Sequence, residues 1–195
     1  MAEVVLVLAS ASPRRSQLLT DAGIAFKAIS PDTGEVACHG ETPEDHVMRL
    51  AREKAEAVSV EYPVLAVLGA DTVIALDGAI FGKPSSEADA RRMLRLFSGR
   101  AHRVLTGVCI VRKSPHRAVE WVTATTVVFR ELTEATIEHY CSSVNTIDKA
   151  GGYAIQELSE LLVVEIQGSY SNVVGLPVEE VKAHLAAFDE CGPRE

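Results

Sequence analysis

Apolar residues are arranged along the chain in short runs that are separated by polar and turn-forming residues. Runs of about five such residues are typical of strands that are buried on both faces. We expect strands of this kind at residues 4–9, 26–30, 64–68, 101–112, 119–130 and 161–166. Shorter strands are predicted at 153–156 and within 168–177, where apolar residues follow pairs of polar or glycine residues.

Between these runs the apolar residues recur at spacings of three and four, which predicts helices. Serine and threonine residues suited to capping precede several of them. The expected helices cover residues 13–23, 43–58, 87–97, 134–142 and 178–188. Alternating strands and helices, with one antiparallel pair within 101–130, predict a mixed α/β (α+β) fold.

The stretch 69–84 combines an acid, a tight-turn signal and a lysine. Asp77-Gly78 between two apolar runs predicts a two-residue hairpin turn, and the resulting register places Thr72 opposite Lys83. Asp71 is expected just past the end of the strand at 64–68, on the face opposite Lys83. This hairpin carries either a site at the mouth of a buried strand or a solvated acid and lysine on the surface.

The first predicted helix begins with cations, where the helix dipole disfavours them. Ser12 is suited to cap this helix, Pro13 to open it, and Arg14 and Arg15 follow in its first turn. An anion bound at the same N-terminus explains the pattern, because free backbone N–H groups and arginine forks both suit phosphate. The alternative is a pair of solvated arginines.

Two further stretches place charge at unusual positions. Lys54 follows the apolar face of the helix at 43–58, so its ammonium either reaches out to solvent or meets an anion. Asp148 and Lys149 precede two glycines, which is typical of a loop whose backbone approaches a ligand. A plain surface turn is the alternative for this second stretch.

The composition excludes several classes of protein. The chain has 195 residues, of which 47% are hydrophobic and 24% charged, and a formal net charge of -8 makes it a poor general binder of nucleic acid polymers. No apolar stretch reaches the length of a membrane span, and the first residues lack a basic leader. Four scattered cysteines without metal-ligand spacing indicate a reduced, cytoplasmic setting. P-loop, serine-hydrolase and dinucleotide-binding motifs are absent.

Segments spread over nearly the whole chain resemble the Maf (septum formation protein) family of nucleoside triphosphate pyrophosphatases. The resembling segments are residues 8–15, 49–55, 69–72 with 82–84, 97–102, 148–151 and 172–177. The form of the Asp-Lys-Ala-Gly and Tyr-x-Ile-Gln motifs is similar to that of the subgroup acting on dTTP and UTP. The family usually has glycine after the glutamine, where this chain has Glu157.

The resemblance implies one Maf-like domain over residues 1–195, with two closely packed lobes, a central cleft and an ITPase-like fold. It implies cleavage of a nucleoside triphosphate to the monophosphate and pyrophosphate with Mg²⁺ or Mn²⁺, by a protein that pairs as a homodimer. The residues at the family's catalytic positions are Asp71, as the base, and Lys83, Glu35 and Lys54. The residues at its substrate positions are Ser10, Arg14, Arg15, Thr72 and Gln156, and those suited to hold the metal are Glu35 and Asp71.

Two other function classes stay open at this point. One is a nucleotide-binding regulator of cell division that does not turn its ligand over, and the other is a structural interaction protein. An acid placed among several cations favours the enzyme, because a binder of phosphate gains little from a carboxylate beside it.

Overall fold

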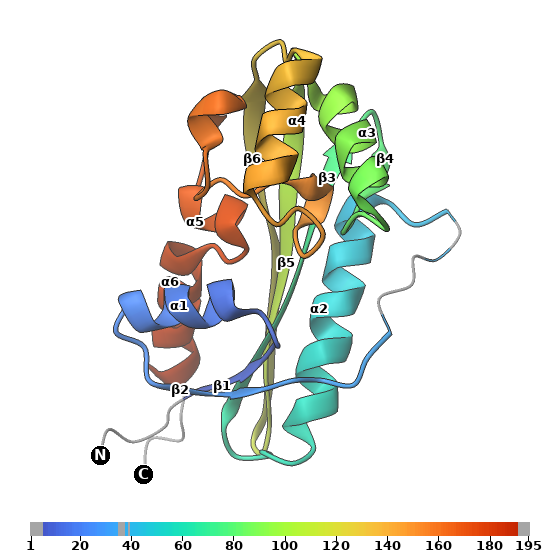
Figure 1. Ribbon diagram of the computed structural model, residues 1–195. Helices are drawn as coiled ribbons and strands as arrows, with labels where there is room; N and C mark the ends of the chain where they lie inside the picture. The colour runs from blue at the N-terminus through green and yellow to red at the C-terminus, as the bar shows by residue number, and fades with distance from the viewer. Residues whose placement is uncertain (1–5, 35–37, 39, 191–195) are drawn as a thin grey trace. The chain divides into compact units, whose positions relative to one another are not determined.

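The computed structural model describes residues 6–34, 38 and 40–190 (Figure 1). The strands are β1 (Leu6–Ala9), β2 (Phe26–Ile29), β3 (Ala66–Leu76), β4 (Ala79–Phe81), β5 (Ala101–Lys113), β6 (His116–Phe129) and β7 (Val163–Gln167). The α-helices are α1 (Pro13–Asp21), α2 (Pro43–Ser59), α3 (Glu87–Phe97), α4 (Glu134–Ser143), α5 (Tyr170–Val174) and α6 (Val178–Glu190). Two short 3-10 helices, η1 (Ala150–Gly152) and η2 (Ser159–Leu161), lie between α4 and β7.

Seven strands form one sheet in the order β2-β1-β3-β5-β6-β7, with β4 paired to β3 outside this order. β1 is parallel to β2 and β3, whereas β3 with β4 and β6 with β7 are antiparallel. The mixed α/β fold expected from the sequence is therefore confirmed.

The chain divides into two compact units. Unit 1 comprises residues 1–71, 106–123 and 175–195, and unit 2 comprises residues 72–105 and 124–174. The long strands β3, β5 and β6 each contribute residues to both units.

In unit 1 the sheet is covered by helices on both faces. Leu6 and Leu8 of β1 belong to an apolar cluster with residues of α1 and α6, whereas Val7 and Ala9 belong to a cluster with residues of α2. Figure 1 shows α2 on one side of β1 and β3, with α1 and α6 on the other. This alternation follows from the two-residue period of a strand, and it explains why both sets of side chains are apolar.

Helix α2 lies very close to the sheet at two glycines. A Cβ added to Gly69 in β3 would lie 2.2 Å from the backbone oxygen of Ala51, and one added to Gly107 in β5 would lie 2.3 Å from that of Val47. Any larger residue at either position would push the helix away from the strands. These glycines therefore set the distance between α2 and the sheet.

The hairpin around Asp77-Gly78 has the predicted turn. Both residues have positive φ, 52° and 79°, as a two-residue turn of this hand requires. The pairs Leu76–Ala79, Ala75–Ile80 and Ile74–Phe81 confirm the first part of the predicted register.

The expected pairing of Thr72 with Lys83 is wrong, because β4 ends at Phe81. The next residue, Gly82, uses its carbonyl to accept a hydrogen bond from Gly151 N–H at 2.9 Å. The backbone beyond Phe81 therefore pairs with a distant loop and does not extend the β3–β4 ladder.

Three other expectations about strands are corrected. Asp71 lies in the middle of β3, because the small residues before it continue the strand instead of ending it. Residues 153–156 form no strand, since Tyr140 Oη bonds the backbone N–H and carbonyl of Ala154. The short strand expected within 168–177 is replaced by α5.

We predict that Gly69→Ala lowers the free energy of unfolding by about 2–3 kcal/mol, because its methyl group would meet the backbone of α2. Urea denaturation of the variant and the parent protein measures this difference. Gly34→Ala is the matched control, since nothing lies within 4 Å of its added Cβ. Equal stability of the Gly69 variant and the parent would contradict the close approach of α2.

Candidate active site

The residues expected to bind phosphate begin where β1 ends. Ser12 caps α1 by accepting a hydrogen bond from the Arg15 backbone N–H at 3.4 Å, and Pro13 occupies the first turn, as predicted. Ser10 Oγ accepts bonds from the Ser12 backbone N–H at 3.2 Å and from Arg15 Nη1 at 3.3 Å. Arg15 Nε also donates to the Gly175 carbonyl at 2.8 Å. These contacts join the start of α1 to the segment that precedes α6.

The electrostatics of this helix start favour an anion. The first turn of α1 contains no acidic residue, and its arginines add positive charge to the partial positive charge of the helix N-terminus. Arg15 is only 9% exposed, so it is not a solvated side chain, while Arg14 is half-buried. The arrangement is suited to hold phosphate oxygens through arginine forks and backbone donors.

Lys54 and Asp71 form a buried ion pair. Their side chains lie on α2 and β3, they are 5% and 7% exposed, and Lys54 Nζ donates to Asp71 Oδ1 at 2.7 Å. Strand alternation gives Asp71 the same face as Gly69, the face that α2 covers. Of the two outcomes expected for Lys54, the structure has the one in which its ammonium meets an anion.

A buried ion pair of this kind contributes little net stability. Desolvation of both charges offsets most of their attraction, and an apolar pair of similar volume is often as stable. Removing only one partner is costly, because the other charge then stays buried without compensation. The pair therefore suits a chemical role for Asp71 better than a purely structural one.

The catalytic candidate Lys83 and the substrate candidates Thr72 and Gln156 belong to unit 2. Thr72 is half-buried in β3, and strand alternation gives it the face opposite to that of Asp71. Lys83 and Gln156 are both exposed. The hydrogen bond from Gly151 N–H to the Gly82 carbonyl joins the loop of Gln156 to the residue next to Lys83.

The loop at 145–157 is held by a buried lysine, a feature that the sequence reasoning missed. Lys149 is 5% exposed, and its Nζ donates to the Asn145 carbonyl at 2.5 Å and to Asp148 Oδ1 at 2.9 Å. It also lies 3.3 Å from Glu157 Oε1, so this carboxylate pairs with its own loop. The charged pair before two glycines was the available signal, but it did not show that Lys149 is buried.

A second anchor of the same loop is the contact between Tyr153 and His102. A hydrogen bond of 2.8 Å joins Tyr153 Oη to His102 Nε2, and the two residues are 5% and 2% exposed. Burial lowers the pKa of His102 to about 4 and raises the pKa of Tyr153 well above its usual range. Both groups are therefore neutral near pH 7.

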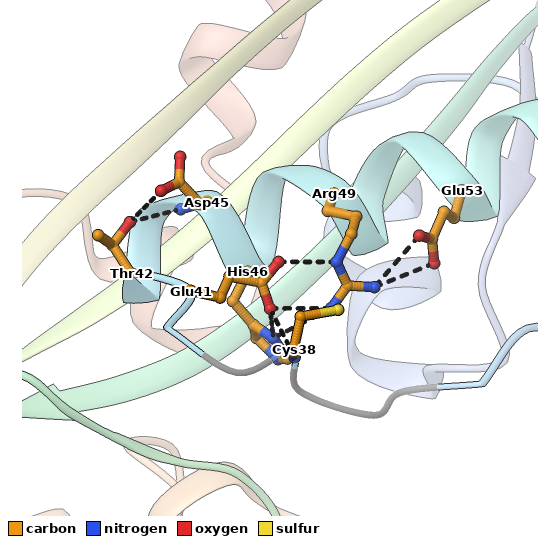
Figure 2. A network of polar contacts seen from close by, with 7 residues as sticks. All are labelled: Cys38, Glu41, Thr42, Asp45, His46, Arg49 and Glu53. Carbon is orange, nitrogen blue, oxygen red and sulfur yellow. Dashed lines mark hydrogen bonds and ion pairs between the residues drawn. The ribbon is translucent and has the colours of Figure 1, made fainter.

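Glu35, expected as a catalytic residue and a metal ligand, lies outside the described residues. Among the described residues after it, Cys38 and Glu41 belong to the polar network of Figure 2, which ties Glu41 to α2. Glu41 accepts hydrogen bonds from Arg49 at 2.7 and 2.9 Å, and it lies 3.0 Å from His46 Nδ1. The hydrogen bonds from Arg49 are the largest cause of a pKa of about 2 for Glu41. This carboxylate is therefore ionised and fixed at the start of α2.

Two features are absent from the described part of the chain. Among the described side chains, those of residues 6–34, 38 and 40–188, there is no group of three or more histidine, cysteine, aspartate or glutamate residues arranged to hold a metal ion. Within the same ranges, no helix combines the length and apolar character that a membrane span needs.

Comparison with known proteins decides the family. The model of the family described as "Maf-like protein" matches residues 5–188. The chain belongs to the Maf family. Among similar Maf relatives, a protein of Anaeromyxobacter dehalogenans (strain 2CP-C) is 50% identical over 92% of both chains. One of Syntrophus aciditrophicus (strain SB) is 46% identical over 90% of this chain and 86% of its own.

Both of these relatives carry the name dTTP/UTP pyrophosphatase. A third relative with the same name, from Clostridioides difficile (strain 630), is 44% identical. The third alignment covers 90% of this chain and 91% of the relative. The fold of this Maf protein is also similar to that of the Ham1 protein of Staphylococcus aureus, with a TM-score of 0.52 and 14% identity. That alignment covers 94% of this chain and 98% of the Ham1 chain, so the ITPase-like fold expected from the sequence is supported.

We predict that Lys54→Met lowers the free energy of unfolding by about 3–4 kcal/mol, because it leaves the Asp71 carboxylate buried without its partner. Adding Asp71→Asn to this variant should restore much of the loss, since the uncompensated charge is then removed. Urea denaturation of both variants measures the coupling.

The control for this prediction is Arg95→Met, which removes an exposed ion pair with Glu134. Exposed pairs contribute about 0–1 kcal/mol, so the control should stay close to the parent protein. A Lys54→Met variant as stable as the control would contradict the prediction, because it would show that burying the Asp71 carboxylate without its partner costs little stability.

Proposed function

We propose that this chain is a nucleoside triphosphate pyrophosphatase that cleaves dTTP and UTP to the nucleoside monophosphate and pyrophosphate. The observation that carries the proposal is the buried ion pair between Lys54 of α2 and Asp71 in the middle of β3, in a chain that shares 44–50% identity with three dTTP/UTP pyrophosphatases. A carboxylate held in one orientation by a lysine can act on a water molecule, whereas a binder of phosphate has no use for it.

Asp71 is the proposed base. Lys54 donates to its Oδ1, which fixes the carboxylate plane and keeps the negative charge in place. Oδ2 is then the oxygen that orients the attacking water and takes its proton, while the new bond forms at the α-phosphorus. The bond between the α-phosphorus and the oxygen that bridges it to the β-phosphorus breaks. Pyrophosphate then leaves, with its negative charge offset by cationic side chains.

Cationic side chains are proposed to hold the triphosphate. Arg14 and Arg15 lie in the first turn of α1, where backbone N–H groups add to their attraction for phosphate oxygens. Ser10 is bonded to Arg15 and offers a hydroxyl at the same place. Lys83 is the proposed cation of unit 2.

A divalent metal, Mg²⁺ or Mn²⁺, fits the proposed chemistry. Such cations take oxygen ligands, and in nucleotide enzymes one or two carboxylates are enough because phosphate oxygens supply others. Asp71 and Glu35 are the carboxylates proposed to hold it. When bound, the metal would stabilise negative charge on the phosphate oxygens.

Recognition of the base is proposed for Gln156, with help from Thr72. The side-chain amide of Gln156 has both a donor and an acceptor, which match the edge of a pyrimidine, and it is exposed on an anchored loop. The carboxylate of the neighbouring Glu157 is paired with Lys149, an arrangement that leaves base contact to Gln156.

We propose that the protein acts in a reduced, cytoplasmic compartment. The described cysteines Cys38, Cys109 and Cys141 are free thiols, which supports a reduced, cytoplasmic compartment. We further propose a single Maf domain over residues 1–195 that acts as a homodimer without nucleic acid or membrane partners, as its acidic charge and family membership suggest.

We predict that the protein releases pyrophosphate from dTTP and UTP with Mg²⁺ or Mn²⁺, and that Asp71→Asn lowers kcat roughly 1,000-fold because no base remains. A panel of nucleoside triphosphates with a pyrophosphate assay measures this. Asp77→Asn is the matched control, since asparagine is equally suited to that turn. Nucleotide binding without turnover by the parent protein would instead favour the regulator, and retained turnover in Asp71→Asn would exclude Asp71 as the base.

We also predict that Gln156→Ala flattens the preference among nucleobases while pyrophosphate release continues, because only contact with the base is removed. The ratio of kcat/KM values across the same panel measures the preference. An unchanged ratio would show that another residue recognises the base.

A further inference from the structure

His102 and Tyr153 lie in the apolar core of unit 2. The rings of Phe97 and Phe129 lie 4.8 and 4.9 Å from that of His102, and the Phe129 ring also lies 4.9 Å from the ring of Tyr153. His102 belongs to β5, whereas Tyr153 follows η1 in the loop that leads to Gln156. The pair therefore connects the sheet of unit 2 to this loop.

The polar atoms of this pair are not needed for packing. Each ring is already surrounded by aromatic neighbours, and a phenylalanine at either position would avoid the cost of burying a polar group. His102 Nδ1 has no hydrogen-bond partner among the described residues, so the histidine is retained with one buried polar atom unsatisfied. The benefit that remains is the directional bond between Nε2 and the Tyr153 hydroxyl.

The loop is fixed along its length up to Gln156. Tyr140 Oη bonds the backbone of Ala154, at 2.9 Å from its nitrogen and 3.4 Å from its oxygen. Tyr153, Ala154 and Ile155 are all buried, and Gln156 is the first exposed residue after them. The position of the Gln156 backbone is consequently set by the buried residues immediately before it.

We propose that His102 and Tyr153 are positioning residues for nucleobase selection, which hold Gln156 in place through their hydrogen bond. This inference rests on the proposed function of Gln156 and extends it to two residues that do not contact the substrate. The hydrogen bond between Gly151 and Gly82 gives Gln156 and Lys83 a common frame. Loosening the Tyr153 anchor thus shifts the amide relative to Lys83, while Asp71 and Lys54 keep their pair.

The test is Tyr153→Phe, which keeps the ring and removes only the hydroxyl. We expect KM for the preferred pyrimidine nucleotide to rise roughly tenfold, with kcat changed less than about twofold, and the preference over purine nucleotides to fall by a similar factor. Tyr62→Phe is the matched control, because it removes an exposed bond to Lys27 in unit 1. This control should keep both KM and the preference.

His102 variants test the same bond from its other side. His102→Leu should reproduce the loss of preference, and His102→Gln should restore part of it, because its amide can reach the place of Nε2. The Tyr153→Phe/His102→Leu double variant should be as selective as either single variant, because each single variant already removes the same hydrogen bond. Thermal unfolding of each variant identifies any that do not fold. If His102→Leu does not fold, the nucleobase preference of His102→Gln, compared with that of the parent protein, tests the bond from the histidine side.

Equilibrium binding of non-hydrolysable dTTP, UTP and purine triphosphate analogues separates this inference from the proposed function. Absence of pyrophosphate release from the parent protein would overturn the function, while a selectivity in binding that falls in Tyr153→Phe would still support the positioning role. Unchanged selectivity in folded Tyr153→Phe and His102→Leu overturns it. An equal loss of kcat for every nucleotide with KM unchanged also overturns it, as does a parent protein without selectivity.

Discussion

The close approach of α2 to β3 is the constraint on which unit 1 depends. Gly69 has no side chain, so the backbone of α2 can lie against the strand, and Lys54 then reaches Asp71 two residues further along the same face. The pair is buried and bonded at 2.7 Å, which leaves the carboxylate little freedom. Such a pair adds little net stability. Its effect is to hold the Asp71 carboxylate in one orientation, which suits the proposed role of Asp71 as a base.

Each unit contains some of the candidate residues. Unit 1 holds the pair with Asp71 and the arginines at the start of α1, which suit phosphate and water. Unit 2 holds Lys83 and Gln156, on segments that a backbone hydrogen bond joins. In unit 2, Gln156 follows immediately after the buried residues 151–155, so rigid backbone sets where this residue begins.

Local signals in the sequence predicted much of this arrangement. Ser12 with Pro13 identified the start of α1, and the Asp77-Gly78 pair identified the hairpin turn, because capping and positive φ depend on nearby residues only. Predictions that relied on a local pattern alone failed where a distant group took the backbone bonds. Tyr140 bonded the backbone of Ala154 and removed the strand expected at 153–156, and Gly151 bonded Gly82 and ended the hairpin ladder.

The sequence by itself determined the mixed α/β class, the order of most elements and, through its motifs, the family and the candidate residues. It could not determine which charges are paired. Lys54 and Asp71 are 17 residues apart, and His102 and Tyr153 are 51 apart, so only the packing of helix, strand and loop brings them within bonding distance. No local sequence pattern encodes the proximity of residues so far apart, so only the tertiary structure decided these contacts. Burial then strengthens the hydrogen bonds that form between them.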